Sequence, residues 1–153
     1  TQSGIPVIYS GDEIGQCNDS DYRQDPEKAP DSRYLHRGKF QWDLAELREQ
    51  EGTYQYDIFH AIRQMETIRK EHSVFLNQAG VRSLETYDPA ILCLVREYDG
   101  NKLIALFNFS SEEKTAWIHE EGMYSDLLTG SEMSGTNVVI QPYGILWLMN
   151  HKL

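Results

Sequence analysis

The half of the sequence that follows Gly80 constrains the fold most, because short apolar runs alternate there with turn residues. The runs are rich in β-branched and aromatic residues, and residues such as Gly, Asp and Pro lie between them. They occupy residues 81–87, 91–98, 102–109, 115–119, 124–127, 137–140 and 144–149. Between the second and third runs, Asp99-Gly100 favours positive φ and predicts a tight hairpin turn. Seven short strands at this spacing predict an antiparallel β-sandwich.

The first half contains one clear helix and a long polar segment. In residues 54–71, apolar side chains recur at spacings of three and four while charged side chains fall on the other side, which predicts an amphipathic helix. The apolar positions are Ile58, Phe59, Ile62, Met65 and Ile68. Residues 11–53 show no sustained period, so we expect a loop with short helical turns. Long loops in compact domains tend to carry binding sites, and we therefore look for function in this segment.

A continuous apolar run, Ile5-Pro6-Val7-Ile8-Tyr9, precedes the polar segment. Such a pattern is typical of a strand that is buried on both faces, and Pro6 limits the usable strand to residues 7–9. This strand needs neighbours that the segment itself does not contain. A structural interaction unit is therefore one hypothesis, in which two copies of the chain self-associate through the unpaired strand.

The charge of the chain excludes two classes of partner. The 24 Asp and Glu residues outnumber the 14 Lys and Arg residues, for a formal charge of −10, so we expect neither a nucleic-acid nor a membrane partner. The first residues lack the pattern of a signal sequence, and the compartment stays open between cytoplasm and secretion. Cys17 and Cys93 lie far apart in unlike surroundings, so we expect two free thiols.

Most common catalytic motifs are absent, including G-x-S-x-G, H-E-x-x-H and the P-loop, and we expect neither a cofactor nor a metal. Asp12 and Glu13 are adjacent, so on an extended chain they point to opposite faces and poorly match two carboxylates about 5 Å apart across a glycosidic bond. We expect a structural hydrogen bond for at least one of them. Asp19, Asp21 and Asp25 could hold a hard cation, but a solvated acidic loop is favoured.

Arg33 and His36 are the remaining candidates in the polar segment. Arg33 lies in an Asp-rich loop, where it could pair with a distant carboxylate and form the floor of a polar pocket. The residue pattern alone favours a surface arginine. His36, as a lone histidine, more often satisfies a local hydrogen bond than it catalyses.

The opening of the chain resembles the eighth barrel strand and following turn of the α-amylase family, glycoside hydrolase family 13. The matching residues are Gly4-Ile5-Pro6-Val7-Ile8-Tyr9-Ser10-Gly11-Asp12-Glu13-Ile14-Gly15. The continuation is similar to the amylosucrase subgroup, which transfers glucosyl units from sucrose to glucan chains. It comprises Asn18-Asp19, Gln24-Asp25, Asp31-Ser32-Arg33-Tyr34 and His36-Arg37, and the resemblance extends to Gln141-Pro142-Tyr143 and Leu146-Trp147-Leu148.

This resemblance implies a mainly β fold and a domain organisation. Residues 79–153 would form the C-terminal antiparallel β-sandwich, usually called domain C. Residues 1–78 would be the last βα segment of a (β/α)8 barrel, with the eighth strand, a long loop and a helix.

The resemblance also implies a division of chemistry. The family's retaining mechanism uses an Asp nucleophile, a Glu acid/base and a stabilising Asp on the fourth, fifth and seventh strands, so no catalytic residue falls in this sequence and we expect the chain alone to be inactive. Arg33 matches the family arginine that forms a salt bridge at the bottom of the donor-sugar pocket, and its carboxylate partner would lie upstream, leaving Arg33 unpaired here. Sucrose and α-glucan are the implied partners of the intact enzyme. An α-amylase or α-glucosidase parent is the alternative.

A carbohydrate-binding module is a hypothesis from a different class. Trp117, Trp147, Tyr124 or Tyr143 could stack on sugar rings, although aromatic residues on sandwich strands more often belong to the core. We expect Trp147 to be buried, because it lies inside an apolar run. Two or more exposed coplanar rings would favour this hypothesis.

Overall fold

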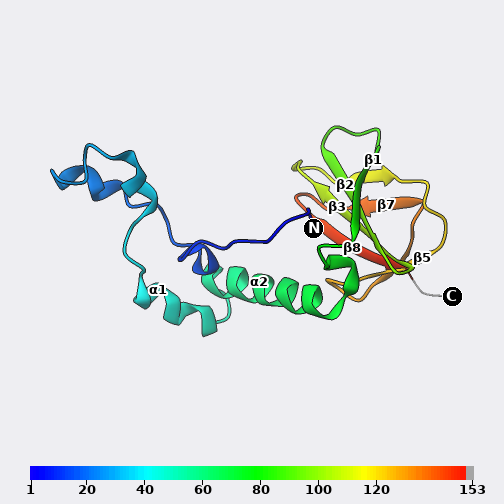
Figure 1. Cartoon of the computed structure of the whole chain (residues 1–153), viewed down its shortest axis with the longest axis horizontal. Helices are drawn as coiled ribbons and strands as arrows, with labels where there is room; N and C mark the ends of the chain where they lie inside the picture. The colour runs from blue at the N-terminus through cyan, green and yellow to red at the C-terminus, as the bar shows by residue number, and fades with distance from the viewer. Residues whose placement is uncertain (151–153) are drawn as a thin grey trace. The chain divides into compact units, whose positions relative to one another are not determined.

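The computed structural model describes residues 1–150 and divides the chain into two compact units (Figure 1). We call the first the β unit, which combines Thr1–Ile5 with the chain from Met65 onward, and the second the loop unit, Pro6–Gln64. The division falls inside helix α2, Tyr54–Glu71, whereas a domain boundary between residues 78 and 79 stays a prediction. No helix in residues 1–150 is long and apolar enough to cross a membrane.

The β unit confirms the predicted antiparallel β fold. Its strands form a six-stranded sheet in the order β1-β2-β3-β8-β5-β6 and a two-stranded sheet, β4-β7, and every pairing is antiparallel. The strands are β1 Gly80–Leu84, β2 Ile91–Tyr98, β3 Asn101–Asn108, β4 Lys114–Trp117, β5 Met123–Asp126, β6 Glu132–Ser134, β7 Asn137–Ile140 and β8 Ile145–Asn150. Each predicted run overlaps a strand, with bounds that differ by a few residues at most. Strand β6 has no counterpart among them, because it is short and Met133 is its single apolar residue.

The predicted hairpin turn joins β2 to β3. Tyr98 pairs with Asn101, so Asp99 and Gly100 form a two-residue loop. Both have positive φ, 49° and 75°, which is the conformation of a type I′ turn and matches the twist of the flanking strands. The turn sets the register of the longest pairing in the sheet.

The large sheet is apolar on both faces, so the β unit has two cores. On one face, Val95, Ile104 and Leu148 pack with Val138 and Ile140 of the two-stranded sheet, which makes the sandwich. On the other face, residues from β2, β3 and β8 pack against the end of α2 and the short 3-10 turn η5, Ser73–Phe75. The second core contains Ile68, Val74, Phe75, Leu103, Ala105 and Trp147. Strand β3 is consequently covered on both faces.

The loop unit contains the first part of the predicted helix, up to Gln64, and several short turns. Helix α2 spans Tyr54–Glu71, which confirms the predicted bounds. The polar segment contains the short turns predicted for it, namely η1 Asp12–Ile14, η2 Ser20–Gln24, η3 Ser32–His36, α1 Trp42–Glu46 and η4 Leu47–Glu49. The loop prediction for this segment is therefore confirmed.

The predicted strand at residues 7–9 is wrong. These residues have no strand conformation, and Val7, Ile8 and Tyr9 are 86%, 46% and 56% exposed. A central strand takes its hydrogen bonds from strands on either side, and within residues 1–150 no strand pairs with this segment. The barrel strand that the resemblance implies is therefore an extended apolar segment in this structure.

Both cysteines are free thiols, as expected. Cys17 is exposed and Cys93 is buried. Burial, with Glu120 as a second cause, raises the pKa of the Cys93 thiol to about 12, which keeps it protonated near neutral pH.

Candidate functional site

The polar segment opens with a turn that glycines make possible. Gly15 has φ 62°, and a Cβ built there would lie 2.7 Å from Cδ1 of Ile58 on α2, so a side chain at this position would clash. Tyr9 N–H donates to Oδ2 of Asp12 over 3.2 Å, and Gly11 N–H donates to Oε2 of Glu13 over 2.7 Å. The structural role expected for at least one of these carboxylates is confirmed.

Gln16 closes the polar segment into a loop. Its Nε2 donates to the carbonyl oxygen of Lys39 over 2.9 Å, and its Oε1 accepts from the Gln41 N–H over 3.0 Å. One amide side chain thus joins two stretches that are far apart in sequence. Sequence reasoning missed Gln16, because nothing local marks an amide that bonds to backbone more than twenty residues away.

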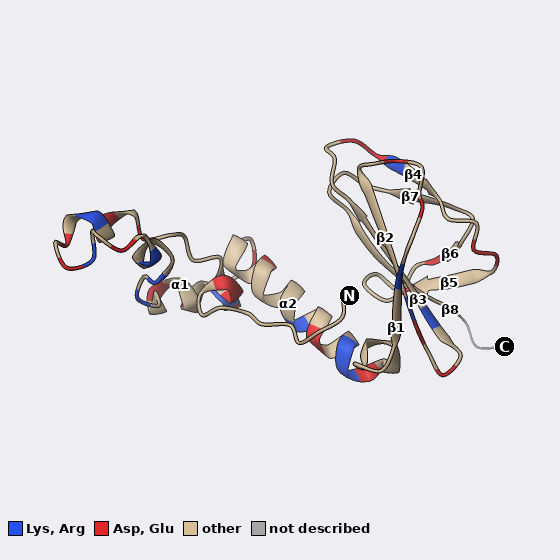
Figure 2. Cartoon of the chain, turned by 45° about the horizontal axis from the view of Figure 1, so that its top comes forward, with Lys and Arg blue, Asp and Glu red and all other residues tan. Residues whose placement is uncertain are grey.

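The closed loop surrounds a cleft in the loop unit. Its volume is about 690 Å³, in the range of small-molecule sites. Its lining is polar and carries both signs of charge, and Figure 2 shows acidic and basic segments following one another along this part of the chain. The lining residues are Gln16, Cys17, Asn18, Asp19, Ser20, Asp21, Lys28, Tyr34, Arg37, Gly38, Lys39 and Gln41. These side chains could donate and accept hydrogen bonds from several directions, which suits a neutral, hydroxyl-rich ligand.

The acidic residues of the segment are engaged locally. Oδ1 of Asp19 accepts from the Asp21 N–H over 3.0 Å and caps η2, and Asp25 pairs with Lys28 at 3.1 Å. Within residues 1–150, no group of three His, Cys, Asp or Glu side chains is arranged to hold a metal ion. The geometry favours the solvated acidic loop over a cation site.

Arg33 has a nearby carboxylate partner, so the expectation that it is unpaired is wrong. Its Nε lies 2.8 Å from Oδ1 of Asp31 and its Nη2 lies 2.7 Å from Oδ2. Asp31 also accepts the Arg33 N–H over 3.0 Å and caps η3. The hydrogen bonds from Arg33 lower the pKa of Asp31 to about 2. The carboxylate of Asp31 therefore pairs with the Arg33 guanidinium, for which we expected a partner only outside this sequence.

Arg33 and His36 have different surroundings. The Arg33 side chain is 69% exposed and is not among the described residues that line the large cleft, whereas its neighbours Tyr34 and Arg37 are. Nδ1 of His36 lies 3.0 Å from Oδ1 of Asn18. This local hydrogen bond is the role expected for a lone histidine.

The aromatic candidates of the β unit divide into two pairs. Trp147 and Tyr124 are buried, 4% and 3% exposed, and belong to the cores. Trp117 and Tyr143 are 53% and 69% exposed. Among the described residues no ring contact joins these two.

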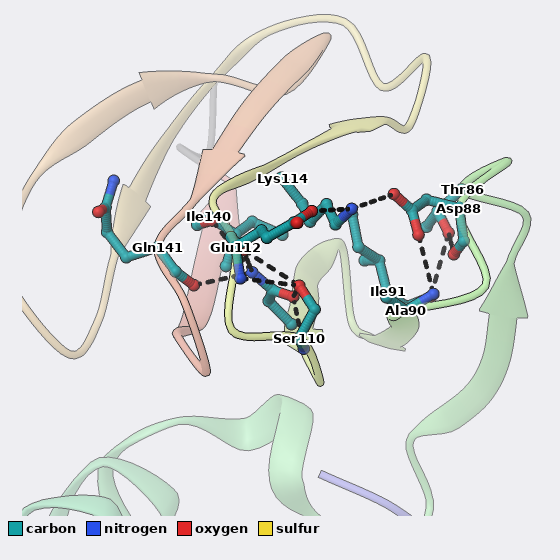
Figure 3. A network of polar contacts seen from close by, with 10 residues as sticks. Thr86, Asp88, Ala90, Ile91, Ser110, Glu112, Lys114, Ile140 and Gln141 are labelled. Atoms are coloured by element: carbon teal, nitrogen blue, oxygen red, sulfur yellow. Dashed lines mark hydrogen bonds and ion pairs between the residues drawn. The ribbon is translucent and has the colours of Figure 1, made fainter.

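Asn108 is a further structural residue that sequence reasoning missed. It is 3% exposed, and its Nδ2 donates to the carbonyl oxygens of Glu112 at 2.7 Å and Gln141 at 3.0 Å. Its Oδ1 accepts from both the N–H and the hydroxyl of Ser110, at 2.9 Å and 2.7 Å (Figure 3). Lys114 of the same network lies between Glu112 and Asp88. One feature of the sequence could have identified this role. Asn108 lies near the end of the apolar run 102–109, and at the end of a strand backbone carbonyl oxygens that have no strand partner need a hydrogen-bond donor.

Three comparisons relate the chain to known proteins. Residues 91–150 match the family model described as the beta-galactosidase C-terminal domain. The glucosylglycerate phosphorylase of Escherichia coli (strain K12) is 23% identical over 148 residues, which cover 95% of this chain and 25% of that protein. The cyclomaltodextrinase of Thermoanaerobacter pseudethanolicus is 28% identical over 141 residues, 91% of this chain and 21% of that protein. The chain thus spans no more than a quarter of these relatives.

Solved structures share the fold. A maltogenic amylase from S. marinus superposes with a TM-score of 0.59 at 23% identity, covering 94% of this chain and 17% of that one. AmyP in complex with maltose gives a TM-score of 0.55 at 20% identity over 62% of this chain and 20% of that one. The β unit has the fold of the C-terminal β domains of amylase-family enzymes.

Proposed function

We propose that this chain is the C-terminal part of an α-glucan-active, retaining glycoside hydrolase or glucosyltransferase, and that the intact enzyme is amylosucrase-like. The observation that carries this proposal is the extent of similarity. The glucosylglycerate phosphorylase match covers 95% of the chain, so it includes the loop unit as well as the β unit. A β domain borrowed by an unrelated protein would match over the β unit alone.

In this proposal Arg33 binds the donor sugar. Its ion pair with Asp31 engages Nε and Nη2, and Nη1 remains for a second acceptor such as a carboxylate or a sugar hydroxyl. The cap that Asp31 gives to η3 fixes the backbone next to that guanidinium. Arg33 is thereby presented on the surface of a short, capped turn.

The chain alone is expected to have no glycosidase or transferase activity. Asp12 and Glu13 bond to neighbouring backbone N–H groups, and neither is placed as one of two carboxylates across a scissile bond. The test is an assay of mass-verified chain on sucrose, starch and maltooligosaccharides, with fructose and glucose followed separately. Reproducible turnover by pure material would overturn the proposal and make Asp12 and Glu13 the first residues to replace.

A fusion tests Arg33 itself. The chain is placed in the E. coli glucosylglycerate phosphorylase in exchange for the quarter of that protein that it matches. In a folded, active fusion we expect Arg33→Lys to lower kcat/KM by at least about tenfold, because a lysine cannot reproduce the planar fork of an arginine. Arg48→Lys is the matched control, since Arg48 pairs with its neighbour Glu49 on η4. Equal kcat/KM for Arg33→Lys and Arg48→Lys would show that Arg33 does not bind the donor sugar.

The second candidate function is a carbohydrate-binding module, and the exposure of Trp117 and Tyr143 is the observation that favours it. Titration with maltotriose, monitored through the indole N–H resonance of Trp117, distinguishes a carbohydrate-binding module from a fragment of a larger enzyme. A saturable shift would support the module. No shift, with a silent activity assay, supports the fragment of a larger enzyme.

We also propose that the exposed segment 5–9 pairs with a second chain at high concentration. Ile5 and Val7 are 81% and 86% exposed, and an unpaired apolar segment is a template for strand addition. Sedimentation velocity tests this: we expect a concentration-dependent dimer that Val7→Lys abolishes. A monomer at all concentrations would refute self-association.

A further inference from the structure

Arg96 is a buried cation in the second core of the β unit. It lies on β2 and is 2% exposed, although it belongs to a strand whose other buried residues are apolar. A buried charge is costly unless its hydrogen-bonding groups are satisfied. Among the described residues, the hydrogen bonds of its guanidinium all go to backbone carbonyl oxygens.

These carbonyls come from two separate stretches of chain. Nε donates to Val74 O over 2.6 Å and Nη2 to Leu76 O over 2.9 Å, both at the turn η5. Nη1 donates to Thr1 O over 2.8 Å and to Gln2 O over 3.0 Å. One side chain therefore bridges the N-terminal segment and the segment that follows α2.

The two segments that Arg96 contacts lie on either side of the loop unit in the sequence. The polypeptide leaves the β unit after Ile5 and returns to it at Met65. Arg96 holds Thr1 and Gln2 before the departure and Val74 and Leu76 after the return. The backbone that precedes the loop unit and the backbone that follows it are therefore both hydrogen-bonded to the Arg96 guanidinium.

The chemistry of the contact explains why the residue is an arginine. A guanidinium offers five N–H donors in a rigid planar fork and remains charged in proteins, so it can serve carbonyls on two of its sides at once. The ring of Phe75 lies beside it, with the ring centroid 6.0 Å from Cζ. A lysine ammonium is a point charge that could not span the same four oxygens.

We propose that Arg96 is a main-chain clasp, a docking site on the β unit that binds the chain's own N-terminal segment through the successive carbonyl oxygens of Thr1 and Gln2. Because the contacts are to backbone, the clasp recognises the main chain of Thr1 and Gln2 and not their side chains. The partner of the site is thus the segment of this chain that runs from Thr1 to Ile5. Its role is to keep the segment that leads into the loop unit on the surface of the β unit.

Nuclear magnetic resonance of the full chain tests the clasp. In the unmodified protein we expect the Arg96 Nε–H to exchange with water far more slowly than that of exposed Arg82, and residues 3–5 to have backbone order parameters near about 0.85. Arg96→Lys and Arg96→Met should lower those order parameters below about 0.6. Arg82→Met, the matched control on β1, and the double variant Thr1→Ala/Gln2→Ala should leave them unchanged.

Three outcomes would overturn the proposal. They are an Arg96 Nε–H that exchanges as fast as that of Arg82, mobile residues 3–5 in the unmodified chain, and unchanged order parameters in a folded Arg96→Lys. A loss of order in the double alanine variant would show that side chains, and not the main chain, are recognised. If neither Arg96 variant folds, the two measurements on the unmodified chain still decide. None of these outcomes depends on the activity of an intact enzyme.

Discussion

The two units of the chain are held together by different means. In the β unit, apolar side chains fill two cores on either side of one sheet, and β3 contributes residues to both. In the loop unit, carboxylates cap two 3-10 turns, the amide of Gln16 bridges two stretches of backbone, and few side chains are buried. The buried residues between Pro6 and Gln64 are Gly11, Ile14, Tyr22, Ala45 and Gln55.

This difference shows which unit depends on its own sequence alone. The β unit fully buries aliphatic side chains such as Val95, Leu103 and Ile104, whereas the loop unit exposes Val7, Trp42 and Tyr54. Burial of a large apolar side chain is worth roughly 1.5–3 kcal/mol, so the loop unit forgoes much of that stabilisation. We therefore expect equal changes of sequence to have unequal effects in the two units.

The largest contrast is expected for truncation of aliphatic side chains. Ile104→Ala removes a side chain that is 0% exposed on β3, and the lost contacts and the cavity should cost about 2–5 kcal/mol of unfolding free energy. Val7→Ala, at a position 86% exposed in the loop unit, should change it by less than about 0.5 kcal/mol. Denaturant unfolding followed by circular dichroism measures both. Similar losses would mean that segment 5–9 is buried in solution.

A polar contact of the β unit should give the next largest effect. Asn108→Ala removes the donor to the Glu112 and Gln141 carbonyls and the acceptor for Ser110, and we expect a loss of about 1–3 kcal/mol because these buried groups would lose their partner. Asn137→Ala, at an exposed position on β7, is the matched control and should stay within about 0.5 kcal/mol of the unmodified chain. A harmless Asn108→Ala would show that water replaces the side chain.

In the 153-residue chain prepared by itself, the amine of Thr1 should give a smaller, pH-dependent effect. Burial first, then the positive charges of Arg69 and Arg96, lower the pKa of the Thr1 amine below its ordinary value of 8.0. In the pH window just below 8.0 the unfolded chain therefore holds a proton that the folded chain has released, and stability rises with pH through this window. Unfolding midpoints between about pH 6 and pH 9 test this. Chemical acetylation of the amine should flatten the profile, and an unchanged slope after acetylation would assign it to another group.

The smallest effect on stability is expected at the exposed ion pair of the loop unit. Arg33→Gln should leave the unfolding midpoint unchanged, because the pair is solvated. The pKa of Asp31, about 2 in the folded chain, should return toward its ordinary value of 3.8 when Arg33 is removed. Carbon-13 NMR of the Asp31 carboxyl during an acid titration follows it directly. A pKa that stays low in Arg33→Gln would mean that the backbone N–H, and not the guanidinium, is responsible.

Local patterns in the sequence predicted local structure well. The apolar period of residues 54–71 gave the bounds of α2, and the run 91–98 with Asp99-Gly100 gave β2 and the turn after it. These features depend on residues close together in the chain, so periodicity and turn chemistry suffice. The short strand β6 lacked a detectable period.

Features that depend on distant residues could not be predicted in this way. The run 5–9 has the composition of a buried strand, but a strand exists only where neighbours supply hydrogen bonds. The Gln16 bridge and the carbonyl partners of Arg96 join residues far apart in sequence. The pairing of Arg33 with Asp31 is different, because a carboxylate two residues before an arginine at a helix start was visible in the sequence.

The position of β8 between β3 and β5 also limits the order in which the strands of the large sheet can pair. Along the chain β8 follows all the other strands, yet in space it lies between β3 and β5. During synthesis on the ribosome, the β5–β6 hairpin therefore has no strand to join, and one edge of β3 stays open, until Ile145–Asn150 has emerged. An apolar strand with an open edge is prone to wrong pairings. Until β8 has paired with both β3 and β5, the open edge of β3 is a place where a wrong strand can pair.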